Sequence, residues 1–444
     1  MQTNFTAEQL RDSHVAESEK ILRKCVHCGF CTATCPTFTL LGDELDSPRG
    51  RIYLIKDMLE NDRPADEKVV KHIDRCLSCL ACMTTCPSGV HYMHLVDHAR
   101  SHIEKTYKRS FSDRLLRGIL AFVLPYPSRF RLALTGAALG RPFAGLFRSM
   151  GGPFAKMAAM LELAPRKIPK KSSINVPVNF KSQTPERKGR VAILSGCAQP
   201  VLKPSINEAT VRLLQRSGYD VVFAKDEVCC GALVHHMGKE EAALENARRN
   251  VDAWTRELEG DGLDAILITA SGCGTTVKDY GFMLREDPDY RDKAARVSGL
   301  TKDITEFLTG ADLGKPVVAT DLSVAYHSAC SMQHGQKITR QPKTLLSAAG
   351  FKVRDVPEGH LCCGSAGTYN ILQPEIAGKL RNRKVANIEK TRPDLIATGN
   401  IGCMTQIGLG TDIPIIHTAE LLDWVYGGPR PEALPGQLET VKAN

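Results

Sequence analysis

The sequence predicts a multidomain protein of mixed α and α/β class, in which an α-helical N-terminal domain precedes a duplicated α/β domain with parallel sheets. Three observations indicate this. Two cysteine runs of identical spacing stand near the N-terminus, strands alternate with helices from residue 190 onward, and four cysteines recur at a nearly constant offset. At 444 residues the chain is too long for one ordinary domain. We expect four parts, 1–110, 111–189, 190–312 and 313–444.

The first observation is the pair of cysteine runs. CVHCGFCTATCP and CLSCLACMTTCP both have the spacing C-x2-C-x2-C-x3-C-P. This is the bacterial ferredoxin spacing, and soft thiolates suit iron–sulfur clusters. In two-cluster ferredoxins the fourth Cys of each run ligates the other cluster. We therefore expect two [4Fe–4S] clusters, one on Cys25, Cys28, Cys31 and Cys86, the other on Cys76, Cys79, Cys82 and Cys35.

Zinc is the alternative metal for these runs, because C-x2-C pairs also bind zinc. A closed zinc site takes four ligands in two pairs, whereas this sequence repeats a run of four. We therefore favour iron–sulfur clusters. The proline after each run, Pro36 or Pro87, fits the start of a helix or turn, where a missing N–H costs little.

Helices are expected around the two runs. Residues 1–24 carry apolar side chains at loose helical intervals. Between the runs, Ser47 followed by Pro48 is a good N-cap for a helix with an apolar face over 52–59. A polar helix is expected to follow Cys86 and to continue to about residue 108.

That last helix carries His91, His94 and His98 on one face. Three imidazoles on one face are a candidate metal site. No other chelating pattern lies between residues 90 and 103. We therefore favour a helix that faces solvent or a partner.

Residues 111–189 form a connector of different character. Residues 100–190 hold 19 Lys or Arg against 4 Asp or Glu, so the net charge of +9 is unevenly placed. Apolar runs with Arg at helical intervals are broken by prolines into short helices, a pattern typical of membrane-surface or partner-binding elements. Helices packed on the neighbouring domains, with Arg reaching outward, are an equally good interpretation. Residues 166–190 are predicted to be an extended linker.

From residue 190 strands alternate with helices. VAILSG leads to Cys197, YDVVFA leads to Cys229 and Cys230, and DAILITA precedes Cys273, with helices expected over 205–217 and 239–257. Strands alternating with helices of this length predict a parallel sheet with helices on its faces.

The same pattern then repeats. SVAYHSAC ends at Cys330, FKVRDV leads to Cys362 and Cys363, and DLIATGNIGC ends at Cys403. The offset between the two sets is 133 residues for the first three cysteines and 130 for the fourth. Each half also ends in a similar helix, DITEFL or HTAELL. The repeat indicates an internal duplication.

These eight cysteines follow strands, where open α/β sheets place their ligand sites. Each half is therefore a candidate site for a metal or a further iron–sulfur centre. Core packing is the alternative, because buried Cys is a small apolar residue, and a catalytic dithiol is a third interpretation. Gly231 and Gly364 fit close backbone approach to a bulky group. Imidazoles that are candidates to tune or ligate a centre are His235, His236, His327 and His360.

Other patterns narrow the function. The chain has sixteen Cys, eight of them with cluster spacing, and no signal-peptide pattern at the start, which favours a reducing cytosol over disulfides. The sequence contains no apolar run of about 18 residues, so we expect no transmembrane helix. We find no G-x-G-x-x-G, P-loop or Ser-His-Asp pattern, so we expect no catalytic residue and no flavin or nicotinamide site on this chain.

The twin runs and the two Cys-Cys-Gly segments resemble the family of the iron–sulfur subunit of glycolate oxidase. The stretch KCVHCGFCTATCPTFTLLGDELDSPRGRIYLIKDMLE is similar to that family, and the resemblance covers essentially the whole chain. It implies cluster ligation by the eight N-terminal cysteines, FAD-containing partner subunits that oxidise glycolate to glyoxylate, and electron transfer through the two clusters towards a quinone. The expected location is cytoplasmic, peripheral on the inner face of the cell membrane, with no nucleic-acid partner.

Two alternatives stay open on the residues alone. Iron–sulfur subunits of D-lactate and glycerol-3-phosphate dehydrogenases have a similar plan, so the chain itself does not separate these substrates. The Cys-Cys-Gly segments also resemble catalytic heterodisulfide reductase subunits, whose motif continues as C-x2-C. Thr276 and Gln406 stand at that last position here, so the five-thiolate set is incomplete in both halves, although four thiolates suffice for a cubane.

Overall fold

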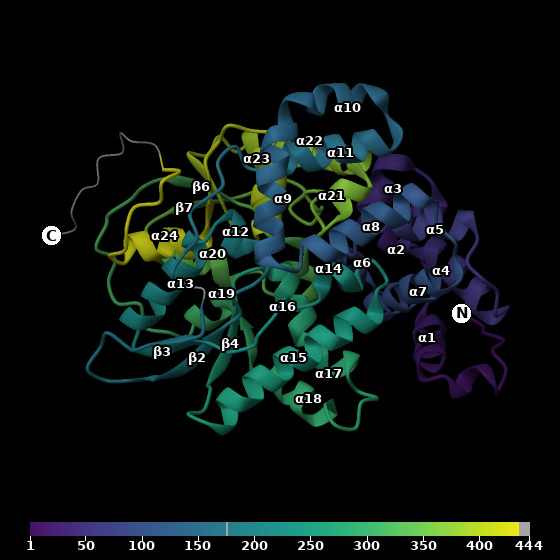
Figure 1. The fold of residues 1–444 in the computed structure, drawn as a ribbon, viewed down its shortest axis with the longest axis horizontal. Coiled ribbons are helices and arrows are strands. Elements are labelled where there is room, and N and C mark those ends of the chain that lie inside the picture. The colour runs from purple at the N-terminus through teal and green to yellow at the C-terminus, as the bar shows by residue number, and fades with distance from the viewer. Residues whose placement is uncertain (175, 435–444) are drawn as a thin grey trace.

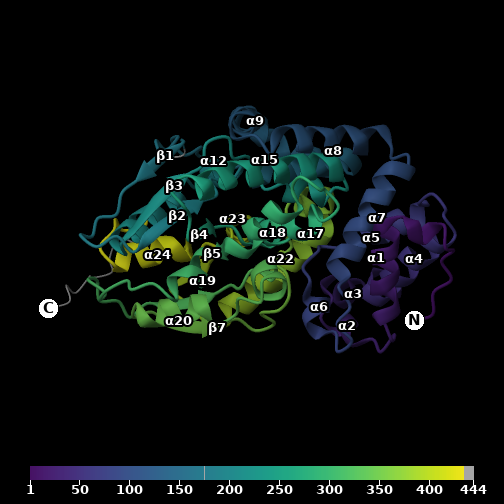
Figure 2. The ribbon, with the colours of Figure 1, turned by 90° about the horizontal axis from the view of Figure 1, so that it is seen from below.

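The computed structural model describes residues 1–174 and 176–434. Its N-terminal region is built of helices and lies at one end of the molecule, coloured purple and blue in Figures 1 and 2. Within the described ranges, no helix is both long and apolar enough to cross a bilayer. The helices of this region are α1 (Ser13–Lys24), α2 (Phe30–Ala33), α3 (Pro36–Leu41), α4 (Pro48–Glu60), α5 (Glu67–Asp74), α6 (Ala81–Thr85) and α7 (Tyr92–Thr106).

Capping residues explain where these helices begin. Ser47 caps α4, because its side chain accepts a hydrogen bond from the backbone N–H of Gly50, and Pro48 occupies the first turn as predicted. The helix expected over residues 1–24 is shorter than predicted, since α1 begins only after Asp12, whose side chain accepts two backbone hydrogen bonds. The residues before it fold back, and the ammonium group of Met1 donates to backbone carbonyls at the end of α1.

The connector forms four helices, of which the last two lie at the top of the molecule in Figure 1 and the first two along its upper edge in Figure 2. They are tied to the N-terminal region by Arg117, which pairs with Asp74 of α5 at 2.9 Å. Leu120 and Leu134 pack onto the first α/β half. The segment 166–190, expected to be an extended linker, contains a short strand, β1 (Val178–Phe180). The connector helices are α8 (Phe111–Val123), α9 (Pro127–Gly140), α10 (Ala144–Met150) and α11 (Gly152–Leu163).

The first α/β half contains a five-stranded sheet of order β1-β3-β2-β4-β5. β1 pairs antiparallel with β3 at one edge, and the other pairs are parallel, as predicted. The strands are β2 (Gly189–Ile193), β3 (Tyr219–Phe223), β4 (Ala265–Ile268) and β5 (Thr301–Asp303). The helices are α12 (Gln199–Leu202), α13 (Ser205–Arg216), α14 (Ala232–His235), α15 (Glu240–Glu259), α16 (Ser271–Lys278), α17 (Tyr280–Met283), α18 (Arg291–Leu300) and α19 (Ile304–Leu308).

The second half contains a four-stranded, all-parallel sheet of order β7-β6-β8-β9. This order matches β3-β2-β4-β5, so the topology agrees with the duplication seen in the cysteine offsets. The strands are β6 (Ser323–Tyr326), β7 (Lys352–Asp355), β8 (Leu395–Thr398) and β9 (Ile415–His417). The helices are α20 (Gln341–Ala348), α21 (Tyr369–Leu372), α22 (Pro374–Glu389), α23 (Ile401–Gly408) and α24 (Thr418–Val425).

The two halves interlock through equivalent helices. The first long helix of each half packs on the closing helix of the other, α13 on α24 and α20 on α19. Both closing helices begin with a capping box, at Asp303 and at His417. One buried apolar cluster therefore spans both sheets, with Val191 and Val324 at equivalent positions. Figure 2 shows the two sheets stacked beside the N-terminal helices.

The N-terminal region contacts both halves. Buried Asp97 of α7 faces His235 of the first half at 3.3 Å, and His94 lies 2.9 Å from Asp279. On the other side, the hydroxyl of Tyr369 in the second half donates to the carbonyl of Arg75. These contacts fix the cysteine runs relative to both sheets.

A buried ionic network lies beneath the second cysteine run. The carboxylate of Asp46, which is fully buried, lies 2.9 Å from Nδ1 of His72, 3.4 Å from the Arg51 guanidinium and 2.8 Å from that of Arg75. Thr37 donates to the backbone carbonyl of Asp46 at 2.7 Å. Buried charges are tolerated only when they are paired and hydrogen-bonded in this way.

We expect Asp46→Ala to destabilise the chain by about 3–5 kcal/mol, because it removes the carboxylate that pairs with the buried guanidinium of Arg51 and with the partly buried one of Arg75. Asp57→Ala is the matched control, since Asp57 pairs with Arg63 at the surface, and we expect it to change stability little. Thermal unfolding of both variants under anaerobic conditions measures the difference. Equal unfolding midpoints in the two variants would contradict the structural role of the network.

Candidate functional site

Two small cavities in the N-terminal region are bounded by the cysteines of the twin runs. Each is lined by the first three cysteines of one run and the fourth of the other, which is the exchange of ligands expected from the spacing. The first cavity is lined by Cys25, Cys28, Cys31 and Cys86, and Cys82 also touches it. The second is lined by Cys35, Cys76, Cys79 and Cys82.

The loops that carry these thiols have the same backbone conformation. His27 and Gly29 of the first run have φ of 58° and 83°, and the equivalent Ser78 and Leu80 have φ of 49° and 62°. When right-handed and left-handed residues alternate, the backbone curves around a centre and its N–H groups turn inward, as in many iron–sulfur sites. Non-glycine residues rarely adopt this conformation, so the strain marks a functional loop.

The thiols require a compensating cation. Burial, together with the neighbouring Cys25, Cys35 and Cys86, raises the pKa of Cys31 to about 11. Burial also holds the pKa values of Cys79 and Cys82 well above the ordinary thiol value. Metal ligation requires thiolates, so binding must release these protons. In donor type, number and enclosure, both cavities fit a [4Fe–4S] cluster.

Two side chains that the sequence did not single out contact these thiols. The guanidinium of Arg51, 1% exposed, lines the second cavity with Nη1 3.8 Å from Sγ of Cys35. Tyr92 lines both cavities, and its hydroxyl lies 3.8 Å from Sγ of Cys76. A buried cation and hydrogen bonds to sulfur are the means by which proteins tune cluster potentials. In the sequence, Arg51 precedes an apolar helix face and carries no motif.

The two cavities differ in their surroundings. Cys28 of the first is exposed and lies among exposed apolar side chains, with Val26 65% and Phe30 62% exposed. Cys79 of the second is buried and shares an apolar cluster with Cys362 of the second α/β half. One cavity is thus accessible from the surface, and the other faces the α/β halves.

In the first half the structure brings the four predicted cysteines together. Cys197, Cys229, Cys230 and Cys273 form a continuous series of sulfur contacts in that order. Hydrogen bonds from Cys197 and Cys230 lower the pKa of Cys229 well below its usual value. All but Cys273 are fully buried.

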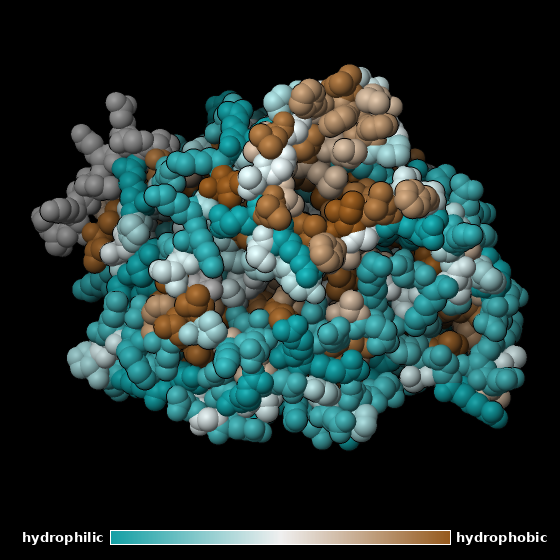
Figure 3. Space-filling model, viewed as in Figure 1, coloured by the Kyte–Doolittle hydropathy of each residue, from teal (hydrophilic) through white to brown (hydrophobic). Residues whose placement is uncertain are grey.

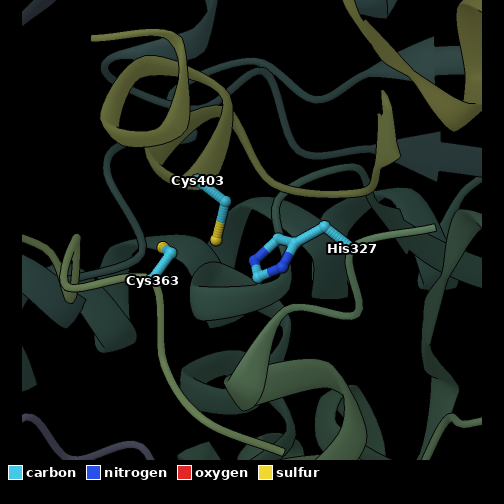
Figure 4. Close-up of side chains that lie close together, drawn as sticks. All are labelled: His327, Cys363 and Cys403. Atoms are coloured by element: carbon cyan, nitrogen blue, oxygen red, sulfur yellow. The ribbon is translucent and has the colours of Figure 1, made fainter. Parts of the chain in front are cut away.

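The second half gathers its four cysteines in the same way. Sγ of Cys330 lies 3.7 Å from Sγ of Cys362, and the contacts continue to Cys363 and Cys403. His327, at the end of β6, joins them: the ligand atoms of His327, Cys363 and Cys403 all lie within 4.8 Å of one another (Figure 4). Burial lowers the pKa of His327 to about 3, so its imidazole is neutral.

A cavity of about 200 Å³ separates the two thiol sets at the carboxyl ends of both sheets. Its walls are mostly apolar, and its polar lining residues include Gln199 from one half and Asn400 from the other. Seven of the eight later cysteines line it, namely Cys197, Cys230, Cys273, Cys330, Cys362, Cys363 and Cys403.

Gly231 and Gly364 do have the close backbone neighbours that were expected, but the neighbour is a helix. Both have φ above 80°, and a Cβ at these positions would lie 3.1 Å from the carbonyl oxygen of Ala243 in α15 and 2.6 Å from that of Ala377 in α22. The glycines therefore allow each Cys-Cys pair to sit against a helix rather than against a bulky bound group.

The remaining candidate histidines have ordinary partners. His94 stacks on Phe282 with ring centroids 3.4 Å apart, and His98 lies 2.7 Å from the Ser18 hydroxyl. His235 and His236 both face Asp97. In the described part of the chain, no metal-binding grouping includes His91, His94 or His98. Their helix packs against the first half of the same chain, an intramolecular contact that the expectation of a solvent- or partner-facing helix did not include.

The positions of the missing fifth thiolates are filled by hydrogen-bonded side chains. Gln406 is buried and accepts from Asn370 while donating to the carbonyl of Ala377. Thr276 bonds to the carbonyl of Gly272 within its own helix. These residues are part of the packing and leave each half with four thiols.

Comparison with known proteins agrees with these sites. Residues 21–90 match the family of 4Fe-4S dicluster domains, and residues 191–278 and 324–408 each match the cysteine-rich domain. A crystal structure of a hypothetical protein from Helicobacter pylori superposes over 95% of this chain and 74% of that chain, with a TM-score of 0.53. At 8% identity, this likeness concerns the fold alone.

Among curated proteins, the glycolate oxidase iron-sulfur subunit of Escherichia coli (strain K12) is 43% identical over 95% of this chain and 98% of its own length. The probable glycolate oxidase iron-sulfur subunit of Bacillus subtilis (strain 168) is 32% identical over 90% and 93%. Lactate utilization protein A of Bacillus licheniformis is 26% identical over 53% of this chain and 99% of its own length. The chain belongs to the family of glycolate oxidase iron–sulfur subunits.

Proposed function

We propose that this chain is the electron-transfer subunit of a flavin-linked glycolate dehydrogenase complex. FAD-containing partner subunits oxidise glycolate to glyoxylate, and the electrons pass through this chain towards a quinone at the membrane. Two [4Fe–4S] clusters, on Cys25, Cys28, Cys31 and Cys86 and on Cys76, Cys79, Cys82 and Cys35, supply the one-electron relay. The observation that carries the proposal is the pair of cavities with exchanged fourth cysteines.

The surroundings of the cavities support a direction of transfer. Electrons enter at the first cavity, where Cys28 is exposed and Val26, Phe30 and Tyr53 form an exposed apolar rim that suits a protein partner. They continue to the second cavity, which is buried against the second half. Arg51 stabilises added negative charge there, because its guanidinium is buried beside Cys35.

Glycolate is favoured over D-lactate and glycerol 3-phosphate by the extent of similarity. Both proteins named as glycolate oxidase subunits match nearly the whole chain, whereas lactate utilization protein A matches about half of it. No specific observation favours a catalytic heterodisulfide reductase, since Thr276 and Gln406 replace the fifth thiolates.

The connector supports a cytoplasmic chain held on an anionic lipid surface. Residues 111–171 hold eleven Lys or Arg against two Asp or Glu, an excess equal to the charge of the whole chain. Both acids, Asp113 and Glu162, are already paired with basic residues of the same segment. The segment is also poor in Asn and Gln, so it offers few of the neutral hydrogen-bonding groups found in protein interfaces.

The same segment exposes a large apolar surface. Twelve of the nineteen large apolar side chains that are exposed in the described ranges lie between residues 111 and 157. Figure 3 shows them as a brown area over the connector helices. Apolar side chains interspersed with basic ones are typical of helices that lie in the interface of an anionic bilayer. They are Phe111, Leu115, Ile119, Phe122, Tyr126, Leu132, Leu139, Phe143, Leu146, Met150, Phe154 and Met157.

Replacing one ligand at each cavity tests the relay. We expect Cys28→Ser and Cys79→Ser each to remove one cluster, so that iron content falls by about half and one of two reduced-cluster EPR signals is lost. Glycolate-dependent quinone reduction should fall to background in both variants. Thr34→Ser, a change in the first run that removes no thiol, is the control. Full quinone reduction by the cluster-depleted variants would place the clusters off the electron path.

Purification of the tagged chain from its own cells tests the partners and substrate. We expect FAD-containing subunits to copurify, and the complex to reduce a dye with glycolate much faster than with D-lactate or glycerol 3-phosphate. Phe30→Glu should weaken copurification without loss of iron, because it places a charge in the apolar rim. A complex that prefers D-lactate would exclude the glycolate assignment.

Vesicle sedimentation tests the lipid surface. We expect the chain to bind vesicles containing phosphatidylglycerol but not pure phosphatidylcholine, and to be released by salt. Leu139→Asp with Leu146→Asp should weaken binding by about tenfold or more, whereas Val317→Asp, an exposed apolar position elsewhere, should not. If the double variant instead keeps lipid binding but loses the flavin subunits, this surface is a protein interface.

A further inference from the structure

The two α/β halves differ where their strands meet the thiols. Aligning RVAILSGC (190–197) with SVAYHSAC (323–330) places His327 opposite Leu194. Aligning DAILITASGC (264–273) with DLIATGNIGC (394–403) places Asn400 opposite Ala270. The duplication therefore carries two polar side chains in the second half at positions that are apolar in the first.

Both polar side chains lie beside the sulfur of Cys403, and His327 also lies beside that of Cys363. The imidazole of His327 is 2% exposed, and its Nε2 is buried without a hydrogen-bond partner. In Figure 4 the ring faces Cys403 and Cys363. Asn400 donates from Nδ2 to Sγ of Cys403 at 3.3 Å. A backbone hydrogen bond from the N–H of His327 to the carbonyl of Ala397 in β8, 2.9 Å long, holds the histidine at the end of its strand.

A buried imidazole nitrogen without a hydrogen-bond partner, lying beside two thiols, provides three ligand atoms for a metal ion. Zinc binds sulfur at about 2.3 Å and imidazole nitrogen at about 2.0 Å, so tetrahedral ligand atoms lie about 3.3–3.8 Å apart. The atoms of His327, Cys363 and Cys403 lie within 4.8 Å of one another, so a small adjustment closes them on one ion. Among the described residues, no three of the N-terminal cysteines are as close, in keeping with a larger cluster there.

We propose that the second half binds a single zinc ion through Nε2 of His327 and Sγ of Cys363 and Cys403. The fourth position faces the cavity between the halves, next to Cys362. Binding releases the two thiol protons to solvent. Asn400 is a positioning residue, because its hydrogen bond orients the Cys403 thiolate. The first half has Leu194 in place of the nitrogen donor and lacks this site.

The site extends the chain beyond electron transfer, because zinc has no redox chemistry. It places a Lewis acid with an open position on the wall of the cavity of about 200 Å³. The ligand class that suits this position is a small thiol or carboxylate, since both bind zinc as anions.

Metal analysis of the anaerobically purified full-length chain tests the proposal. We expect about one zinc per chain in addition to iron, and a zinc X-ray absorption spectrum with imidazole and sulfur neighbours. His327→Leu, which installs the residue of the first half, should reduce zinc content by about tenfold or more and leave iron content and cluster EPR signals unchanged. His360→Leu and Cys273→Ser are the matched controls, and both should retain zinc.

Cys403→Ser provides a second variant in case His327→Leu does not fold, and it should also lose zinc. Cobalt substitution of the wild-type chain gives a readout without mutation, because thiolate-to-cobalt charge-transfer bands require sulfur ligands. Zinc near zero in the wild type, or iron in excess of two clusters that His327→Leu removes, would overturn the proposal in favour of a third cluster. Loss of the N-terminal clusters would lower the iron content but not the zinc content. Failure of the proposed electron relay can therefore be told apart from failure of the proposed zinc site.

Discussion

The structure depends on one electrostatic constraint: most of the sixteen thiols are buried, and a buried thiolate must be stabilised by nearby positive charge or by hydrogen bonds. The fold gathers the thiols into four sets, of which the first is open to the surface at Cys28. In the N-terminal region, left-handed residues curl both loops, and the Asp46–Arg51–His72 network brings a fixed cation to the second cavity. Metal supplies the remaining charge, so cluster binding and folding of this region are coupled.

The duplication gives the two halves the same order of parallel strands and equivalent cysteine positions. Their contacts with the N-terminal region differ. Its second cavity lies against Cys362 of the second half, while α7 contacts the first half through Asp97. The second half is also the one with His327 and Asn400 beside its thiols. Two copies of one unit have therefore been given different surroundings and different donor atoms.

Much of this arrangement could be predicted from the sequence because spacing and offset encode it. Cysteine spacing predicted the grouping of each fourth cysteine with the other run, which the linings of the two cavities match, and Ser47-Pro48 predicted the start of α4. β1 was missed, since a three-residue edge strand has no periodicity to detect. Arg51 was missed, and His327 was named only as one of four candidate imidazoles, because their roles arise from contacts with residues 16 to 76 positions away.

The exchanged packing of α13 on α24 and α20 on α19 restrains how the molecule can move. Neither half can swing outward without uncovering the cluster of apolar side chains that both share. The separation between the thiol sets of the two halves is therefore fixed. Electron transfer through the chain then requires no moving carrier domain. Its rate depends on the distances between fixed centres and on the driving force, and not on diffusion of a domain.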